Sequence, residues 1–222
     1  MAEKKRFVVI GLGNFGASAA AMLYRQGHEV IAIDISEETV DRVAPNVTRA
    51  AVGDGRDATV LSYLGGDEAD VGIVSTGDDI TASVLATLTL LDLNIKSVIV
   101  KVISEDHSRV MKRIGASQTV FPEKDTAENL AQSLSDDSVL SYTRIGSGFA
   151  MQEMTTPPCW QGKTLRELKL PTRYNLAVAG IHHMKTDTLS IPPDPDVPLL
   201  ESDTLLIAGS DKALKQASDL EE

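Results

Sequence analysis

Six short apolar runs, separated by longer stretches with helical spacing, constrain the first half of this chain more than any other feature. The runs are 7–10, 30–33, 49–52, 71–75, 97–102 and 118–120. Between two of them, Val84, Leu88 and Leu91 recur at the spacing of an amphipathic helix. Strands that alternate with helices need crossover connections, which predict a parallel sheet covered on both faces. The sequence therefore predicts a Rossmann-like, doubly wound α/β fold over residues 1–123.

The rest of the chain has a different pattern. Residues 124–142 begin with helical spacing and then become polar, which predicts a helical connection. Over residues 143–222 we expect a small α+β C-terminal domain with a thin core. Its strands are predicted at 149–154, 176–181 and 204–208, and its helices at 163–168 and 212–217.

Composition and charge exclude several classes of protein. The 222 residues carry a formal net charge of −11, which argues against binding nucleic acid or anionic lipid through basic residues. No segment approaches the roughly 20 apolar residues of a membrane-spanning helix. The single cysteine, Cys159, excludes an internal disulfide. We expect a cytoplasmic protein that reaches the inner face of a membrane only through a partner.

A glycine-rich turn follows the first apolar run and opens a helix. Its residues are Gly11, Leu12, Gly13, Asn14, Phe15 and Gly16. In this context Gly11 permits a tight turn, Gly13 lets the backbone approach a diphosphate, and Gly16 lets the helix pack against the strand. The helix N-terminus then presents free N–H groups to phosphates. The pattern predicts a nucleotide site that includes Asn14 and Phe15.

Polar residues at the ends of later strands extend this predicted site. Asp34 follows the second run, where a carboxylate binds the hydroxyls of an adenosine ribose; the alternative is a helix cap. Asp54, Thr76 and Gly77 follow the third and fourth runs, and they are either ligand contacts or turn residues. Lys101 is a candidate phosphate partner, or a surface lysine.

These residues resemble the RCK family, the domains that regulate potassium conductance, and above all its KtrA and TrkA group of potassium-uptake gating subunits. The resemblance spans nearly the whole chain, and it is carried by residues 7–16, 27–30, 32–34, 113–116, 122–125 and 130–136. It implies a gating subunit that forms homodimers and then an octameric ring beneath a membrane channel subunit of the KtrB or TrkH type. It also implies that ATP and ADP compete for the glycine-rich site and that their exchange changes the shape of the ring.

The resemblance implies two further ligands. Glu123 falls where the family has a carboxylate near the nucleotide, which can bind a divalent cation such as Mg²⁺ or Ca²⁺; the alternative is a favourable charge at a helix start. The C-terminal domain of some members binds cyclic di-AMP between two copies. Candidates for that ligand here are Arg173, Asn175, His182 and His183.

One departure and several alternatives stay open. Members of the KtrA type can carry an arginine at the position of Asn14, so a preference for ATP over ADP is not predicted. NAD or NADH shares the adenosine diphosphate half, which leaves an NAD(H)-sensing subunit as an alternative. An NAD-dependent oxidoreductase is a further alternative, although no Tyr-x-x-x-Lys pair exists and His107 is expected to be exposed. No Cys and His cluster indicates a zinc site.

Overall fold

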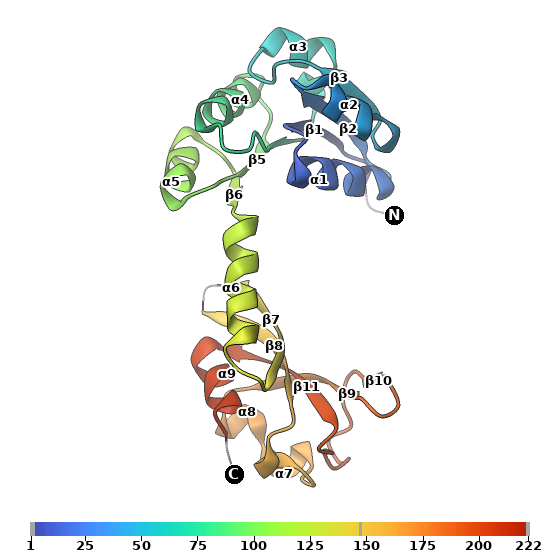
Figure 1. Cartoon of the computed structure of the whole chain (residues 1–222), viewed down its shortest axis with the longest axis vertical. Coiled ribbons are helices and arrows are strands. Elements are labelled where there is room, and N and C mark those ends of the chain that lie inside the picture. The colour runs from blue at the N-terminus through green and yellow to red at the C-terminus, as the bar shows by residue number, and fades with distance from the viewer. Residues whose placement is uncertain (1–2, 147, 221–222) are drawn as a thin grey trace. The chain divides into compact units, whose positions relative to one another are not determined.

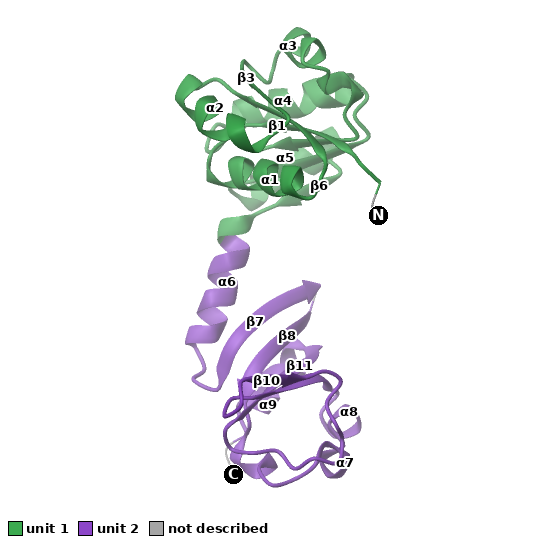
Figure 2. Ribbon diagram, turned by 90° about the vertical axis from the view of Figure 1, so that its right-hand side faces the viewer, with its two compact units in different colours: residues 1–123 green, residues 124–222 purple. Residues whose placement is uncertain are grey.

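The computed structural model of the chain (Figure 1) describes residues 3–146 and 148–220. The chain divides into two compact units, which meet between Glu123 and Lys124 (Figure 2). Each unit has its own sheet and its own core.

Unit 1 contains a sheet in which every neighbouring pair of strands is parallel. Within the described residues its six strands run in the order β3-β2-β1-β4-β5-β6. The order reverses direction between β1 and β4, and ligands of open α/β sheets bind at the carboxyl ends of strands beside such a switch point. The strands are β1 (Arg6–Ile10), β2 (Glu29–Asp34), β3 (Arg49–Val52), β4 (Val71–Val74), β5 (Ser97–Lys101) and β6 (Gln118–Val120).

Helices cover both faces of this sheet because successive strand residues point to opposite sides. In β1, Phe7 and Val9 pack in one buried cluster, and Val8 and Ile10 pack in the other. The helices of the first cluster are α1 (Asn14–Arg25) and α2 (Glu37–Val43). Those of the second are α3 (Ala58–Tyr63), α4 (Ile80–Asp92) and α5 (Glu105–Ile114). The predicted doubly wound α/β fold is confirmed.

The N-terminus of α1 differs from those of its neighbours. Asp79 Oδ1 accepts a hydrogen bond from the Ala82 N–H at 2.8 Å, and Ser104 Oγ accepts one from the His107 N–H at 3.0 Å, so α4 and α5 have side-chain caps. At α1 the capping position is Gly13, which has no side chain to serve this purpose. The first N–H groups of α1 are therefore left for another acceptor.

Unit 2 contains an antiparallel sheet that, within the described residues, has five strands in the order β10-β9-β11-β8-β7. The helix α6 (Pro122–Leu134) begins at the end of unit 1 and continues into unit 2. The strands are β7 (Val139–Gly146), β8 (Phe149–Thr155), β9 (Ala177–His183), β10 (Thr188–Ser190) and β11 (Asp203–Ser210). The other helices are α7 (Leu165–Leu168), α8 (Leu170–Arg173) and α9 (Asp211–Ser218).

The core of unit 2 is built around Trp160, which is 1% exposed and meets Tyr174 edge to face at 5.6 Å between ring centroids. The small α+β C-terminal fold is confirmed. Two strands were not predicted. In the described strand β7 only Val139 is buried, so its sequence lacks the apolar alternation of a strand, and β10 has only three residues.

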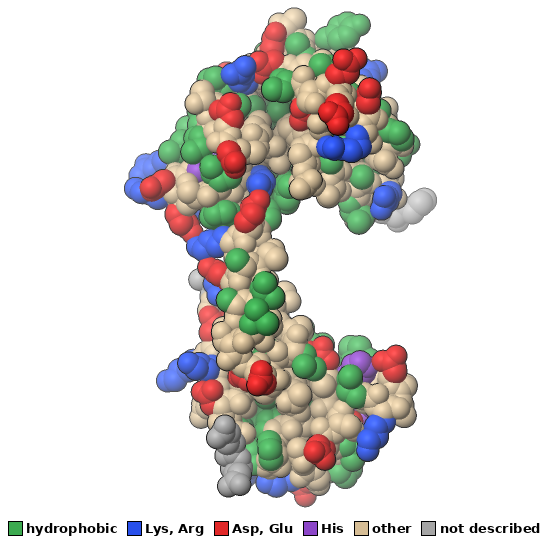
Figure 3. Space-filling model, viewed as in Figure 1, with side chains coloured by type: hydrophobic (Ala, Val, Ile, Leu, Met, Phe, Trp, Pro, Cys, Tyr) green, Lys and Arg blue, Asp and Glu red, His purple; other side chains and the backbone are tan. Residues whose placement is uncertain are grey.

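The helix α6 leaves apolar side chains in solvent. Leu130 is 56% exposed and Leu134 is 74% exposed. Figure 3 shows apolar atoms on the surface along this helix. The adjoining strand β7 adds Leu140 and Ile145, which are 49% and 58% exposed.

The expectation for His107 was wrong. The side chain lies on the inner face of α5 together with Ser108 and Met111, and its residue is 2% exposed. Within the described part of the chain its Nε2 atom has no hydrogen-bond partner. Burial lowers the pKa of the His107 imidazole, because an apolar environment disfavours the charged ring.

We expect His107 to make the protein less stable in mild acid. Below a pH of about 6.5, His107 binds a proton in the unfolded chain but stays neutral in the folded chain. The free energy of unfolding therefore falls by up to ~1.4 kcal/mol per pH unit, until the pH reaches the lowered pKa of the folded state. In urea unfolding followed by circular dichroism, His107→Gln should show a weaker pH dependence than the wild type. His28→Gln, the matched control, should keep the wild-type slope. Equal slopes for all three proteins would contradict this assignment.

Candidate functional site

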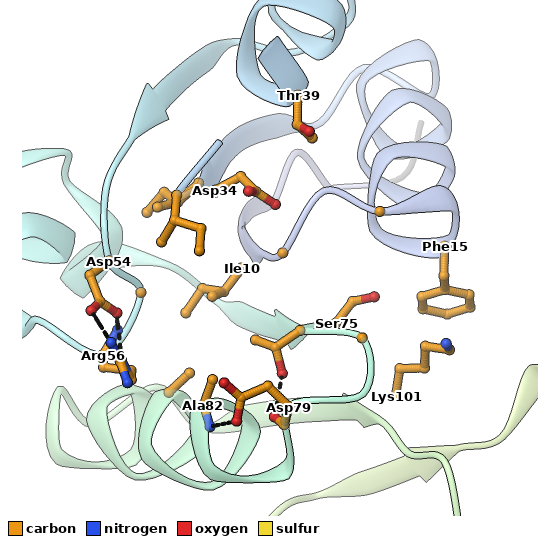
Figure 4. A pocket seen from close by; sticks show the side chains of 18 of the residues that line it. Ile10, Phe15, Asp34, Thr39, Asp54, Arg56, Ser75, Asp79, Ala82 and Lys101 are labelled. Atoms are coloured by element: carbon orange, nitrogen blue, oxygen red, sulfur yellow. Dashed lines mark hydrogen bonds and ion pairs between the residues drawn. The ribbon is translucent and has the colours of Figure 1, made fainter. Parts of the chain in front are cut away.

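A cleft of about 590 Å³ lies at the carboxyl ends of β1, β2, β3 and β4, where the strand order reverses (Figure 4). All of its lining residues belong to unit 1. Those that the sequence predicted are Gly11, Gly13, Asn14, Phe15, Asp34, Asp54, Thr76, Gly77, Lys101 and Glu123. Of the residues predicted for the nucleotide site, only Gly16 does not line the cleft.

The three glycines of the turn have different surroundings. A Cβ atom on Gly11, whose φ is +86°, would lie 2.2 Å from the carbonyl oxygen of Ser75. A Cβ atom on Gly16 would lie 1.9 Å from the carbonyl oxygen of Gly11. At Gly13 a Cβ atom would meet nothing within 4 Å. Gly11 and Gly16 therefore allow the strand and the helix to approach closely, whereas Gly13 leaves the floor of the cleft open.

The N-terminus of α1 forms one end of the cleft. Asn14 and Phe15 are the first two residues of the helix and line the cavity. Lys101, at the end of β5, lies at the same end of the cleft as Phe15 (Figure 4). Uncapped N–H groups and the positive end of the helix dipole favour an anion at this place.

Asp34 is held in place by backbone N–H groups. Its Oδ2 atom accepts a hydrogen bond from the Leu12 N–H at 2.7 Å, and its Oδ1 atom accepts one from the Ser36 N–H at 2.9 Å. The cap of α2 is Ser36, whose Oγ accepts from the Thr39 N–H at 3.3 Å. The carboxylate thus connects β2 to the glycine turn and still lines the cleft, where it has acceptor capacity left for a ligand.

Lys101 already has an acidic partner. Its Nζ atom lies 2.6 Å from Glu123 Oε1, and its side chain is 13% exposed. The hydrogen bond from Lys101 lowers the pKa of the Glu123 carboxyl. Glu123 is the second residue of α6, so this ion pair joins the end of β5 to the helix that leaves unit 1.

The opposite end of the cleft holds a second ion pair. Arg56 Nη2 lies 2.6 Å from Asp54 Oδ2 (Figure 4). The hydrogen bonds from Arg56 lower the pKa of the Asp54 carboxyl and those to Asp54 raise the pKa of the guanidinium. The cleft is also lined by apolar residues: Ile10, Ile33, Ile35, Ala82 and Ala86.

The charges of the cleft are mostly negative. Four carboxylates line it, from Asp34, Asp54, Asp79 and Glu123, against the two cations Arg56 and Lys101. Within the described residues, no group of three His, Cys, Asp or Glu side chains is placed to hold a metal ion. A freed Lys101 or an added cation would therefore strengthen the binding of a phosphate at the N-terminus of α1.

The candidate residues of unit 2 are not gathered at one point. Arg173 lines a separate cavity of about 320 Å³ beside Trp160 and Tyr174. Asn175 precedes β9 with a left-handed backbone, φ 55°. His182 and His183 lie at the far end of β9, where His182 Nε2 is 3.0 Å from Asp187 Oδ1 and His183 Nδ1 is 3.1 Å from Asp203 Oδ1.

Both units match domains of known proteins. The TrkA-N domain matches residues 7–122, more than half of the chain, and the TrkA-C domain matches residues 153–221. The chain belongs to the RCK family. It is 36% identical over 214 residues to the Ktr system potassium uptake protein A of Bacillus subtilis (strain 168), and 96% of each chain is covered. It is 35% identical over 207 residues to the Ktr system potassium uptake protein C of the same organism, with 93% of each covered.

Solved structures agree on the fold of this RCK chain. The GsuK channel bound to NAD is 24% identical, with a TM-score of 0.54; the match covers 98% of this chain and 38% of that longer one. By its relatives the RCK chain is a KtrA-type regulatory subunit of potassium uptake and not an enzyme. No helix in residues 3–146 or 148–220 is long and apolar enough to cross a membrane.

Part of the cleft of this RCK subunit was not predicted from the sequence. Arg56, Asp79 and the apolar residues Ile10 and Ile35 were not predicted to line it. Arg56 follows Gly53-Asp54-Gly55 after β3, and proximity to a predicted ligand residue was the available signal. The apolar residues gave no such signal, because an isoleucine at the end of a strand is usually part of the hydrophobic core.

The glycines offer a test that separates folding from binding. We expect Gly16→Ala to lower the free energy of unfolding by about 2 kcal/mol or more, because the new methyl group overlaps the Gly11 carbonyl. Gly13→Ala should cost less than about 1 kcal/mol, but its methyl group would fill the place where a diphosphate meets the helix. Thermal melting and calorimetric titration with ADP measure the two effects. If Gly13→Ala binds ADP like the wild type, the cleft is not a diphosphate site.

Proposed function

We propose that this RCK chain is the cytosolic gating subunit of a potassium uptake channel and that it responds to adenine nucleotides. The observation that carries the proposal is the open floor at Gly13, between the uncapped N-terminus of α1 and the fixed carboxylate of Asp34. In this arrangement the diphosphate would lie against Gly13, Asn14 and Phe15. The ribose hydroxyls would donate to Asp34, and the base would lie among the apolar residues beyond it.

The Lys101–Glu123 pair gives a physical route from the cleft to the rest of the subunit. An anionic phosphate at the N-terminus of α1 would compete with Glu123 for Lys101. Release of Glu123 would change the first turn of α6, the helix that continues into unit 2. A divalent cation, Mg²⁺ or Ca²⁺, would then bind the freed carboxylate together with the phosphates. A nucleotide shifts the subunit only if it binds one of its conformations more tightly.

The partners in this proposal are a second copy of the chain and a membrane subunit. The relatives named Ktr system potassium uptake proteins support a membrane channel partner of the KtrB or TrkH type, with this chain peripheral to the inner face of the membrane. The exposed apolar residues of α6 and β7 support homodimers, because surface of this kind is covered in an assembly. The octameric ring, and cyclic di-AMP at the C-terminal domain, remain proposals from the resemblance alone.

The first test is calorimetric titration of the purified chain with ADP, ATP and NADH, with and without Mg²⁺ or Ca²⁺. Tighter binding of ADP or ATP than of NADH, with the cation affecting ATP, supports the proposal. NADH as the tightest ligand would instead favour the NAD(H)-sensing alternative, which the GsuK channel bound to NAD also suggests. No binding of any of the three would overturn the proposal.

Asp34→Asn should weaken ADP binding by roughly 10- to 100-fold. The substitution removes a charged acceptor for the ribose hydroxyls, and hydrogen bonds to charged groups contribute about 1.5–3 kcal/mol. The matched control is Asp41→Asn, which makes the same charge change on the exposed side of α2. The ADP affinity of the control should equal that of the wild type. Equal losses in both variants would point to net charge instead of a contact.

Glu123→Gln should tighten ADP binding several-fold when no divalent cation is present, because the variant frees Lys101 for the phosphates. The same variant should lose the effect of Mg²⁺ or Ca²⁺ on ATP binding. Glu128→Gln is the control: it lies on the same helix and pairs with Lys124 and Arg144, outside the cleft. Unchanged ADP affinity in Glu123→Gln would show that the ion pair does not compete with the ligand.

A further inference from the structure

The second cavity of the molecule, of about 320 Å³, lies entirely within unit 2, beside the short helices α7 and α8. All of its lining residues belong to one chain, so the cavity is complete without a second copy. Two aromatic rings line it: Trp160 is 1% exposed, and Tyr174 meets it edge to face. Leu168, which is also buried, adds an aliphatic side chain. The cavity therefore offers apolar surface to a ligand.

Hydrogen bonds fix the backbone around this cavity. The Gly162 N–H donates to the Leu199 carbonyl oxygen at 2.8 Å, and the Leu199 N–H donates to the Lys163 carbonyl oxygen at 3.0 Å. These two bonds hold the segment between Trp160 and α7 in place. Lys169 has a left-handed backbone, φ 50°, and makes the turn between α7 and α8, so that both helices border the same cavity. The cavity is therefore part of the packed fold.

The charge of this cavity is opposite to that of the cleft in unit 1. Lys163 and Arg173 line it as cations, and neither forms a salt bridge within the described residues. The acid among its described lining residues is Glu167, whose Oε2 atom already accepts from the Thr164 N–H at 2.8 Å and from Thr164 Oγ1 at 3.1 Å. In a chain with a net charge of −11, two such cations at one cavity favour an anionic ligand.

One polar atom of a lining residue lacks a partner. The Nε1–H of Trp160 is buried and has no acceptor within the described residues. Buried N–H groups are almost always hydrogen-bonded, so an orphan of this kind points to an acceptor from outside the chain. An indole nitrogen only donates, and its partner has to be an acceptor such as a carboxylate oxygen.

We propose that this cavity binds a small organic carboxylate. The carboxylate would lie between the Arg173 guanidinium and the Lys163 ammonium, because a guanidinium matches the two oxygens of a carboxylate. One of these oxygens would accept from the Trp160 N–H. The apolar part of the ligand would pack on Leu168 and Tyr174, surface that an inorganic anion would leave uncovered. The inference does not depend on the proposed function, since the nucleotide cleft belongs to the other unit.

The fluorescence of Trp160 reports directly on this cavity, because it is the single tryptophan of the chain. The test titrates the purified chain with isovalerate, a branched carboxylate, at constant ionic strength. We expect a saturable change in emission. Isoamyl alcohol, which has the same carbon skeleton without the charge, and inorganic phosphate should bind at least about tenfold more weakly. No saturable change with isovalerate, or equally tight binding of phosphate, would overturn this inference.

Two arginine variants separate a contact from an effect of net charge. Arg173→Gln should weaken isovalerate binding by roughly tenfold or more, because the variant loses hydrogen bonds from a charged group. Arg166→Gln is the matched control: it makes the same change on α7, at an arginine that pairs with Asp196 and does not line the cavity. The control should keep the wild-type affinity. Equal losses in the two variants would overturn the assignment of Arg173.

Trp160→Phe tests the indole donor, since it keeps an aromatic ring and removes the N–H. Calorimetry replaces fluorescence for this variant, and thermal melting of all three variants checks that they fold. We expect isovalerate to bind about three- to tenfold more weakly than to the wild type. Wild-type affinity in a folded Trp160→Phe protein would overturn the role of the indole N–H.

Discussion

The close approach of α1 to the end of β1 is the constraint on which the rest of unit 1 depends. Gly16 meets the Gly11 carbonyl so closely that no side chain fits between them, and Gly11 meets Ser75, the residue that follows β4. These contacts bring the uncapped helix N-terminus to the point where the strand order reverses. The bond from the Leu12 N–H to Asp34 then joins the turn to β2. One turn thus sets the positions of the helix, the carboxylate and the open floor at Gly13.

The charge of the cleft supports the proposal that a ligand there acts on the subunit. Four carboxylates face two cations, and each cation is already paired with one of them. In the proposed function a diphosphate competes with Glu123 for Lys101, and Glu123 belongs to α6. The other cation, Arg56, pairs with Asp54 at the far end of the cleft, and its carbonyl oxygen accepts a hydrogen bond from Thr89 on α4.

Most of the fold could be predicted because its signals are local. The alternation of apolar runs and helical stretches, with glycines at 11, 13 and 16, indicates the doubly wound sheet of unit 1. The same reasoning failed where burial and sequence pattern disagree. The strand β7 is mostly exposed and forms an edge of its sheet. It is a strand because it pairs with β8, since its sequence does not alternate between apolar and polar residues. His107 was expected at the surface because histidine is polar, whereas its side chain lies on the inner face of α5.

The sequence by itself determined the turn, its place between a strand and a helix, and the family to which the chain belongs. Those features depend on backbone conformation and on residues near one another in the chain. Only the tertiary structure decided which glycine of the turn leaves open space in the cleft, which acid pairs with Lys101, and that Arg56 lies beside Asp54 at the far end. These contacts join the ends of separate strands and helices. Their geometry follows from how the sheet is ordered and packed, which no single segment encodes.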